Sequence, residues 1–156
     1  MSKRYEKNAS VSGIDEGRPT AKGGRMRGAG VGTLLGLSGL VLLAIGGSVL
    51  LAPHGFYASN GIVLGADPSQ LSEVRAPAGL LLLAGVMGLL GAFRRRLRRP
   101  ALAITAAVYG SYGLSRLLGV ALDGLPGEGL VMAMALELAI GALAAVTLLR
   151  LRDELA

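Results

Sequence analysis

Residues 79–110 read GLLLLAGVMGLLGAFRRRLRRPALAITAAVYG, in which two apolar stretches are separated by five arginines within six positions. A helix that crosses the hydrocarbon core of a membrane needs about 20 predominantly apolar residues. Lys and Arg collect in the short cytoplasmic loops that join such helices. Pro100 opens the second stretch at its first turn, where its missing N–H costs no helical hydrogen bond. The segment therefore predicts two membrane helices joined by a short cytoplasmic turn.

Four such apolar stretches follow one another, and together they predict an all-α fold, an integral membrane four-helix bundle. We place the spans at about residues 30–52, 76–93, 101–122 and 130–149. The first span is longer than the apolar core of a signal peptide, which has about 7 to 15 residues, so we expect it to be retained. The membrane domain then covers residues 29–152, and residues 153–156 form a C-terminal tail.

Lys and Arg are distributed unevenly between the two sides that these spans define. Seven precede the first span, five lie between the second and third, and two follow the fourth, whereas the two opposite connections hold one, Arg75. By the positive-inside rule, this places both termini in the cytoplasm. Residues 1–28 are polar, rich in Gly and Ser, and lack an apolar period, so we expect a disordered cytoplasmic tail there.

The composition excludes several classes of protein. With 52% hydrophobic and 17% charged residues, a soluble domain of this length would have more apolar surface than it can bury, so the expected partner is the lipid bilayer. The net charge of +6 does not indicate nucleic acid, because the basic residues flank apolar spans. No cysteine and a single His54 leave no thiolate or multi-histidine site, so we expect no cofactor and no metal. A metal site would have to combine these residues, which lack a diagnostic spacing: His54, Asp67, Glu73 and Asp123.

The helix that holds the second span is predicted to begin outside the hydrocarbon. Asp67 is suited to the N-cap, Pro68 to the first helical position, and Gln70 to the third position after the cap. Further along, Pro77 is expected to bend or break the helix before it enters the membrane.

The first span begins with glycines at a spacing of four residues, namely Gly28, Gly32 and Gly36. This pattern lets two helix backbones approach closely in lipid. We expect packing within the same chain, and the alternative is a face for a homo-oligomer.

Two charged residues stand well inside the third and fourth spans, where the bilayer makes an unpaired charge expensive. Arg116 lies seven residues before Asp123, or about 10 Å below the external end, and Glu137 lies eight residues after Gly129, or about 12 Å below it. The matched depths predict a charge-assisted pair between Arg116 and Glu137.

The polar residues of the third span share one helix face, because Tyr109, Tyr112, Arg116 and Asp123 follow spacings of three, four and seven. We expect that face to look into the bundle. Two interpretations remain open. In the first, the ion pair only fixes the helix register. In the second, an outward-opening polar cavity is lined by Arg116, Glu137, Tyr109 and Tyr112, with Glu73, Arg75 and Asp123 at its mouth.

Two segments, GFYASNGIVLGADPSQLSEVRAPAG and YGSYGLSRLLGVALDGLPGEGLVMAMALELAIG, carry a resemblance to a known family. They resemble the bacterial domain-of-unknown-function 4345 family of small four-span membrane proteins, over residues 30 to about 150. The matching residues are Glu73, Arg75, Gly79, Arg116, Asp123 and Glu137. The resemblance implies four spans in the bacterial inner membrane, and the family has no established activity to carry over.

The function expected from these observations is a non-enzymatic multi-pass membrane protein. Its outward-facing cavity would bind a small amphipathic or anionic molecule, such as a lipid headgroup or a quinone-like compound, with Arg75 and Arg116 supplying positive charge. The alternative is an accessory or scaffolding subunit whose glycine-rich faces bind a membrane protein partner. A quinone-linked redox component is the third possibility, but the sequence contains no set of cofactor ligands.

Overall fold

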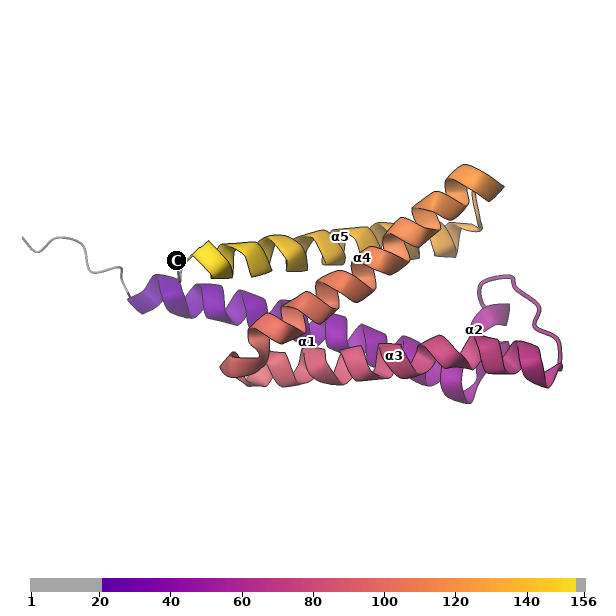
Figure 1. Ribbon diagram of the computed structural model, residues 1–156, viewed down its shortest axis with the longest axis horizontal. Coiled ribbons are helices and arrows are strands. Elements are labelled where there is room, and N and C mark those ends of the chain that lie inside the picture. Colours follow the sequence, from indigo (N-terminus) through magenta and orange to yellow (C-terminus); the bar gives the residue numbers. More distant parts are fainter. Residues whose placement is uncertain (1–20, 154–156) are drawn as a thin grey trace, which may run out of the picture.

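The computed structural model describes residues 21–153, and within them the backbone forms helices and connections without a β-strand. The helices are α1 (Ala21–Leu51), α2 (Pro53–Ala58), α3 (Pro68–Phe93), the one-turn 3-10 helix η1 (Arg95–Leu97), α4 (Arg98–Asp123) and α5 (Glu128–Asp153). Figure 1 shows the four long helices running back and forth, with α1 beside α3 and α4 beside α5. The all-α prediction is confirmed, and the predicted tails lie largely outside the described residues.

Three helices are long and apolar enough to cross a membrane. They are Gly28–Leu51, Pro68–Phe93 and Glu128–Leu151, with mean hydropathies of 2.3, 2.0 and 2.1. The predicted second and fourth spans fall within them, and the predicted first span exceeds its helix by one residue, Ala52, as expected for a membrane protein. The predicted third span lies in α4, which has 26 residues but falls outside this group because it is less apolar than the other three long helices.

The predicted start of α3 is confirmed in its atomic detail. Asp67 Oδ1 accepts hydrogen bonds from the backbone N–H groups of Ser69 at 2.7 Å and Gln70 at 3.0 Å, and Pro68 takes the first helical position. The hydrogen bonds from the backbone N–H groups of Gln70 and Ser69 lower the pKa of Asp67. The Gln70 side chain accepts from the N–H of Gly65 at 2.9 Å, so it fastens the preceding loop to the helix.

The helix is not broken at Pro77, because α3 continues without interruption to Phe93. A proline inside a helix deprives the carbonyl four residues earlier of its donor. Here that carbonyl belongs to Glu73, and both residues are exposed near the loop end of the helix. The missing hydrogen bond therefore lies on the exposed side of α3, next to Ala78, which is buried against α1.

α1 and α3 come closest where glycines of the two helices meet. A Cβ atom at Gly39 would lie 2.8 Å from the Gly85 carbonyl oxygen, and one at Gly85 would lie 2.8 Å from the Gly39 carbonyl oxygen. A Cβ atom at Gly88 would lie 3.0 Å from the Gly39 Cα. Only hydrogen fits at these positions, so the two backbones are in direct contact.

The predicted glycine series of α1 also packs within the chain, but less tightly. A Cβ atom at Gly36 would lie 3.7 Å from the Ala92 Cβ, and one at Gly32 would lie 3.4 Å from the Ala92 carbonyl oxygen. A Cβ atom at Gly28 would meet the guanidinium of Arg98 at 3.2 Å. Packing within the chain is confirmed, although the closest approach lies one turn later in the helix.

α4 and α5 form a second close pair. A Cβ atom at Gly141 would lie 2.8 Å from the Gly110 nitrogen, and one at Gly113 would lie 2.8 Å from the Leu138 side chain. Because Arg116 follows Gly113 by one turn and Glu137 precedes Leu138, this contact brings the two charged residues to the same level.

Burial is concentrated toward η1. One buried cluster consists of Leu35, Ala101, Leu102 and Ala144, and a second surrounds Leu42, Leu81, Ala84, Val108 and Tyr109. α4 buries no residue after Gly113, and its next leucines are exposed, Leu114 by 60% and Leu118 by 60%. In Figure 1, α4 runs away from α3 toward its connection with α5. The bundle is closed near η1 and open at the opposite end.

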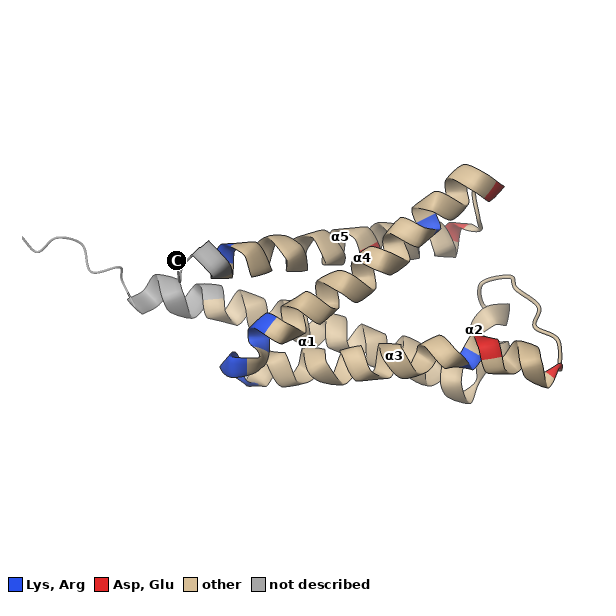
Figure 2. Ribbon diagram, in the orientation of Figure 1, with Lys and Arg blue, Asp and Glu red and all other residues tan. Residues whose placement is uncertain are grey.

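Charges are segregated between these two ends. Figure 2 shows the arginines around η1 and at the end of α5, and the acidic residues at the start of α3 and around the connection between α4 and α5. Among the described basic residues, Arg75 and Arg116 are the exceptions, because they lie toward the acidic end.

Candidate functional site

The predicted pair between α4 and α5 is present. The Nε–H of Arg116 donates to Glu137 Oε2 at 2.9 Å. The Arg116 side chain is 34% exposed and that of Glu137 is 14% exposed, so the carboxylate is the more enclosed partner. The pair lies just beyond the glycine contact of the two helices, in the open half of the bundle.

The guanidinium of Arg116 is only partly used by this contact. An arginine carries five N–H donors in a planar fork. Within the part of the chain that the structure describes, Nε alone forms a hydrogen bond, and it uses one oxygen of Glu137. The two terminal amino groups of Arg116 therefore remain available to an acceptor that is not among the described residues.

Tyr109 lies on the predicted inward face and serves the packing of the bundle. Its side chain is 4% exposed, and its hydroxyl donates to the backbone carbonyl of Ser38 in α1 at 2.8 Å. Ser38 is itself buried and donates from its hydroxyl to the carbonyl of Leu35 at 3.3 Å. The bond from Tyr109 joins α4 to α1, two helices that are not neighbours in the chain. The sequence contains no signal that identifies the Ser38 carbonyl as its acceptor.

Tyr112 packs against the same core. It is partly buried and contacts the cluster that contains Leu42 and Val108. Its position one turn before Arg116 places it between the closed core and the ion pair. Tyr109 and Tyr112 therefore lie on the predicted inward face, where they pack against the core. Of the four polar residues of that face, only Arg116 pairs with Glu137.

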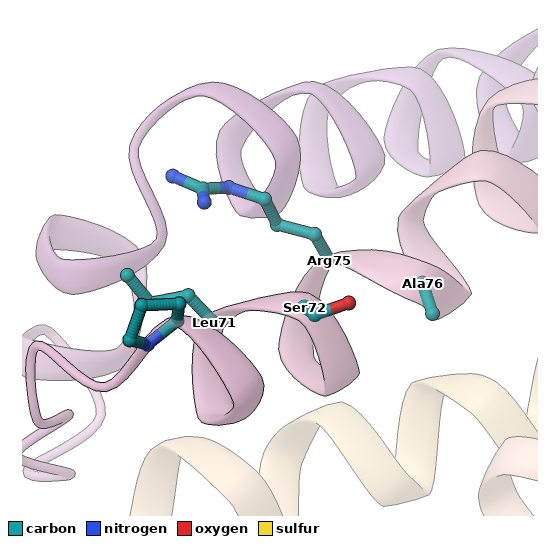
Figure 3. A pocket seen from close by; sticks show the side chains of 5 residues that line it. Leu71, Ser72, Arg75 and Ala76 are labelled. Carbon is teal, nitrogen blue, oxygen red and sulfur yellow. The ribbon is translucent and has the colours of Figure 1, made fainter.

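Arg75 lies at the predicted outer mouth and contacts the end of α1. Its Nε–H donates to the carbonyl of Leu50 at 3.1 Å, where a cation complements the partial negative charge of a helix C-terminus. Figure 3 shows the Arg75 side chain extending from α3 toward the neighbouring helix. A hollow of about 550 Å³ beside it is lined by Pro68, Leu71, Ser72, Arg75 and Ala76.

The two carboxylates expected at the mouth are not brought to Arg116. Glu73 is exposed on α3, and Asp123 is exposed at the last position of α4, before Gly124 with a φ of 94°. Neither forms a salt bridge with another residue whose side chain the structure describes. Of the predicted cavity residues, Arg75 alone lines the hollow on α3, so a shared cavity with Arg116 stays a prediction.

His54 lies in the short helix α2, within the connection between α1 and α3. Its Nε2 lies 3.2 Å from the carbonyl oxygen of Gly65, which ties the beginning of this connection to its end. Among the described residues, no group of three or more His, Asp or Glu side chains is arranged to hold a metal ion.

Comparison with known proteins identifies one family. No curated protein and no solved structure matches the chain. The family model described as "Domain of unknown function (DUF4345)" matches residues 32–148. The matched region extends from α1 to the last turns of α5 and includes both Arg116 and Glu137. The chain therefore belongs to the DUF4345 family.

Proposed function

We propose that the chain is a four-span protein of the bacterial inner membrane with both termini in the cytoplasm. In this proposal it is not an enzyme, and its outward-facing site binds a small amphipathic or anionic molecule at Arg116. The observation that carries the proposal is the ion pair itself. Arg116 is a third exposed, in the open half of the bundle, and uses one of its donors for Glu137.

The length of α4 and the pairing of its arginine support α4 as a membrane span, which brings the number of spans to four. A helix of 26 residues reaches about 39 Å, which exceeds the hydrocarbon thickness of about 30 Å. An unpaired arginine at mid-membrane costs about 2.5 to 3.5 kcal/mol on insertion scales. The contact with Glu137 offsets part of this cost.

Cysteine labelling in intact cells tests the topology, and the chain has no native cysteine to interfere. A membrane-impermeant reagent added outside should label Ser59→Cys and Gly127→Cys but not Ser12→Cys or Leu97→Cys. External labelling at position 97 would overturn the proposal, because that residue lies in the arginine turn.

The exposed guanidinium supports binding of an anion. Carboxylate and phosphate groups match the planar fork of arginine, and the interaction is strongest where water is excluded. Tyr112, one turn before Arg116 on the same face of α4, and the apolar helix α5 around Glu137 suit a ligand with an apolar part. A small amphipathic anion fits both features.

Native mass spectrometry of the protein extracted in its own lipids tests the site. Arg116→Lys should keep the fold and lose most of a retained small molecule, because an ammonium cannot reproduce the planar contact. Glu73→Gln, Arg75→Lys and Asp123→Asn test the outer mouth in the same way. If retention is unchanged while thermal stability falls in every variant, these residues are structural and the site is wrong.

The second candidate is an accessory subunit, which the exposure of α5 favours. Only 11% of the most apolar 18-residue stretch of α5 is buried within the chain, against 33% for the corresponding stretches of α1 and α3. Leu136 and Leu143 are exposed on it by 57% and 55%. A membrane protein partner retained in the same mass spectra, without a small molecule, would favour this function.

A further inference from the structure

The arginine turn forms a second concentration of charge, at the end opposite Arg116. Arg94, Arg95, Arg96 and Arg99 are exposed, and Arg98 is partly covered. Among residues 28–151, no carboxylate lies near this end (Figure 2). Among these residues, no acidic side chain balances the positive charge of the turn, and an anion from outside them would be attracted there.

Arg98 differs from its neighbours because it lies over α1. A Cβ atom at Gly28 would lie 3.2 Å from one terminal nitrogen of its guanidinium, and a Cβ atom at Gly32 would lie 3.5 Å from the other. The two glycines thus leave the space that the guanidinium occupies. The Nε of Arg98 is buried without a hydrogen-bond partner among the described residues. A buried donor without an acceptor is costly, and contacts of an anion with the rest of the guanidinium would offset part of this cost.

The surface beside the turn is apolar. Leu83, Val86, Leu90 and Phe93 follow one face of α3 and are exposed by 62%, 45%, 37% and 85%. Phe93 immediately precedes the arginines, where an aromatic ring suits the membrane interface. An apolar stripe that ends at a group of cations matches a molecule with an acyl chain and an anionic headgroup.

We propose that the arginine turn binds an anionic phospholipid. The headgroup phosphate contacts Arg98, the exposed arginines surround it, and an acyl chain lies along the α3 stripe. A phosphate presents oxygens in the geometry that a guanidinium fork recognises. The proposal requires the helices to lie in a membrane, but it does not depend on the Arg116 site, which is at the other end of the bundle.

Native mass spectrometry of the delipidated full chain in detergent tests the proposal with two lipids of identical acyl chains. Dioleoyl phosphatidylglycerol should bind in preference to dioleoyl phosphatidylcholine. Arg98→Gln should lower this preference about fivefold, the factor expected for one basic residue close to an anionic headgroup. Arg98→Lys should lose less, because it keeps the charge and loses the fork.

Arg150→Gln is the matched control, because it removes one exposed arginine from the end of α5 at the same side of the membrane. Arg150→Gln should change the preference for phosphatidylglycerol less than twofold, because Arg150 lies outside the arginine turn. Equal losses in Arg98→Gln and Arg150→Gln would overturn the site and indicate general surface attraction. Equal binding of dioleoyl phosphatidylglycerol and dioleoyl phosphatidylcholine by the unchanged protein would also overturn it, since the two lipids share their acyl chains and differ in headgroup charge.

A second variant protects the test against a failure of Arg98→Gln to fold, which circular dichroism would reveal. Arg95 is exposed in η1, so Arg95→Gln removes a charge without disturbing the packing. The preference for phosphatidylglycerol should fall in this variant as well. An unchanged preference in both Arg95→Gln and Arg98→Lys would contradict the proposal.

Discussion

The two ends of the bundle are held together by different interactions. Near η1 and in the middle, α1 and α3 touch through glycine backbones, and small residues such as Ala101 and Ala144 fill the core. Toward the opposite end, α4 and α5 leave the other two helices and share the Arg116 to Glu137 pair. In lipid, apolar side chains gain little by touching each other rather than acyl chains. Close backbone contact therefore holds the helices together at one end, and an ion pair holds α4 and α5 together at the open end.

Removing one partner of the ion pair should cause the largest loss of stability. Arg116→Leu or Glu137→Leu alone leaves one charge without its partner and should cost about 3 kcal/mol of stability. The double substitution should recover much of that loss. Unfolding followed by circular dichroism in one detergent gives the three values, and a double variant that only sums the two losses would contradict the pair.

Disturbing the closed end should have the next largest effect. Gly39→Ala places a Cβ atom 2.8 Å from the Gly85 carbonyl oxygen and should destabilise the fold by about 2 kcal/mol, as overpacking does. Gly47→Ala is the control, because a Cβ atom there has no neighbour within 4 Å. The same unfolding measurement applies, and equal losses for the two variants would mean that the glycine contact is not selective.

Removing the hydrogen bond between α4 and α1 should have a smaller effect. Tyr109→Phe keeps the ring in the core and leaves the Ser38 carbonyl without this donor, which should cost about 1 kcal/mol. Tyr112→Phe is the matched control, since the Tyr112 hydroxyl has no hydrogen bond within the described chain. The stability of Tyr112→Phe should equal that of the unchanged protein.

The smallest effect on stability is expected at the start of α3, which is exposed and lies outside the packed part of the bundle. Hydrogen bonds from Gln70 and Ser69 lower the pKa of Asp67, so the cap stabilises the folded helix above the ordinary pKa of an aspartate. This contribution is lost as the pH falls through the lowered pKa of the folded state. The protection of the Ser69 and Gln70 amides against hydrogen exchange, relative to an unstructured chain at the same pH, should then fall, and Asp67→Asn should remove this pH dependence of the protection. Unchanged pH dependence in that variant would contradict the cap.

Short-range patterns predicted the elements of this chain well. Apolar runs of span length predicted the long helices, and the arginines after Phe93 predicted the turn between α3 and α4. The order Asp67, Pro68 predicted the start of α3 because capping depends on residues within one turn. The pair of Arg116 and Glu137 was predictable because both depths can be counted from the same short connection.

Contacts between distant helices depended on the tertiary structure. The sequence offers many glycines in α1, yet the closest approach is at Gly39, which depends on the rotation and crossing of two helices. The acceptor of the Tyr109 hydroxyl lies 71 residues away and is a backbone carbonyl, which every residue possesses. The position of Arg98 over Gly28 has the same origin. Helical period determines which residues share a face, whereas only the packed arrangement of helices decides what that face meets.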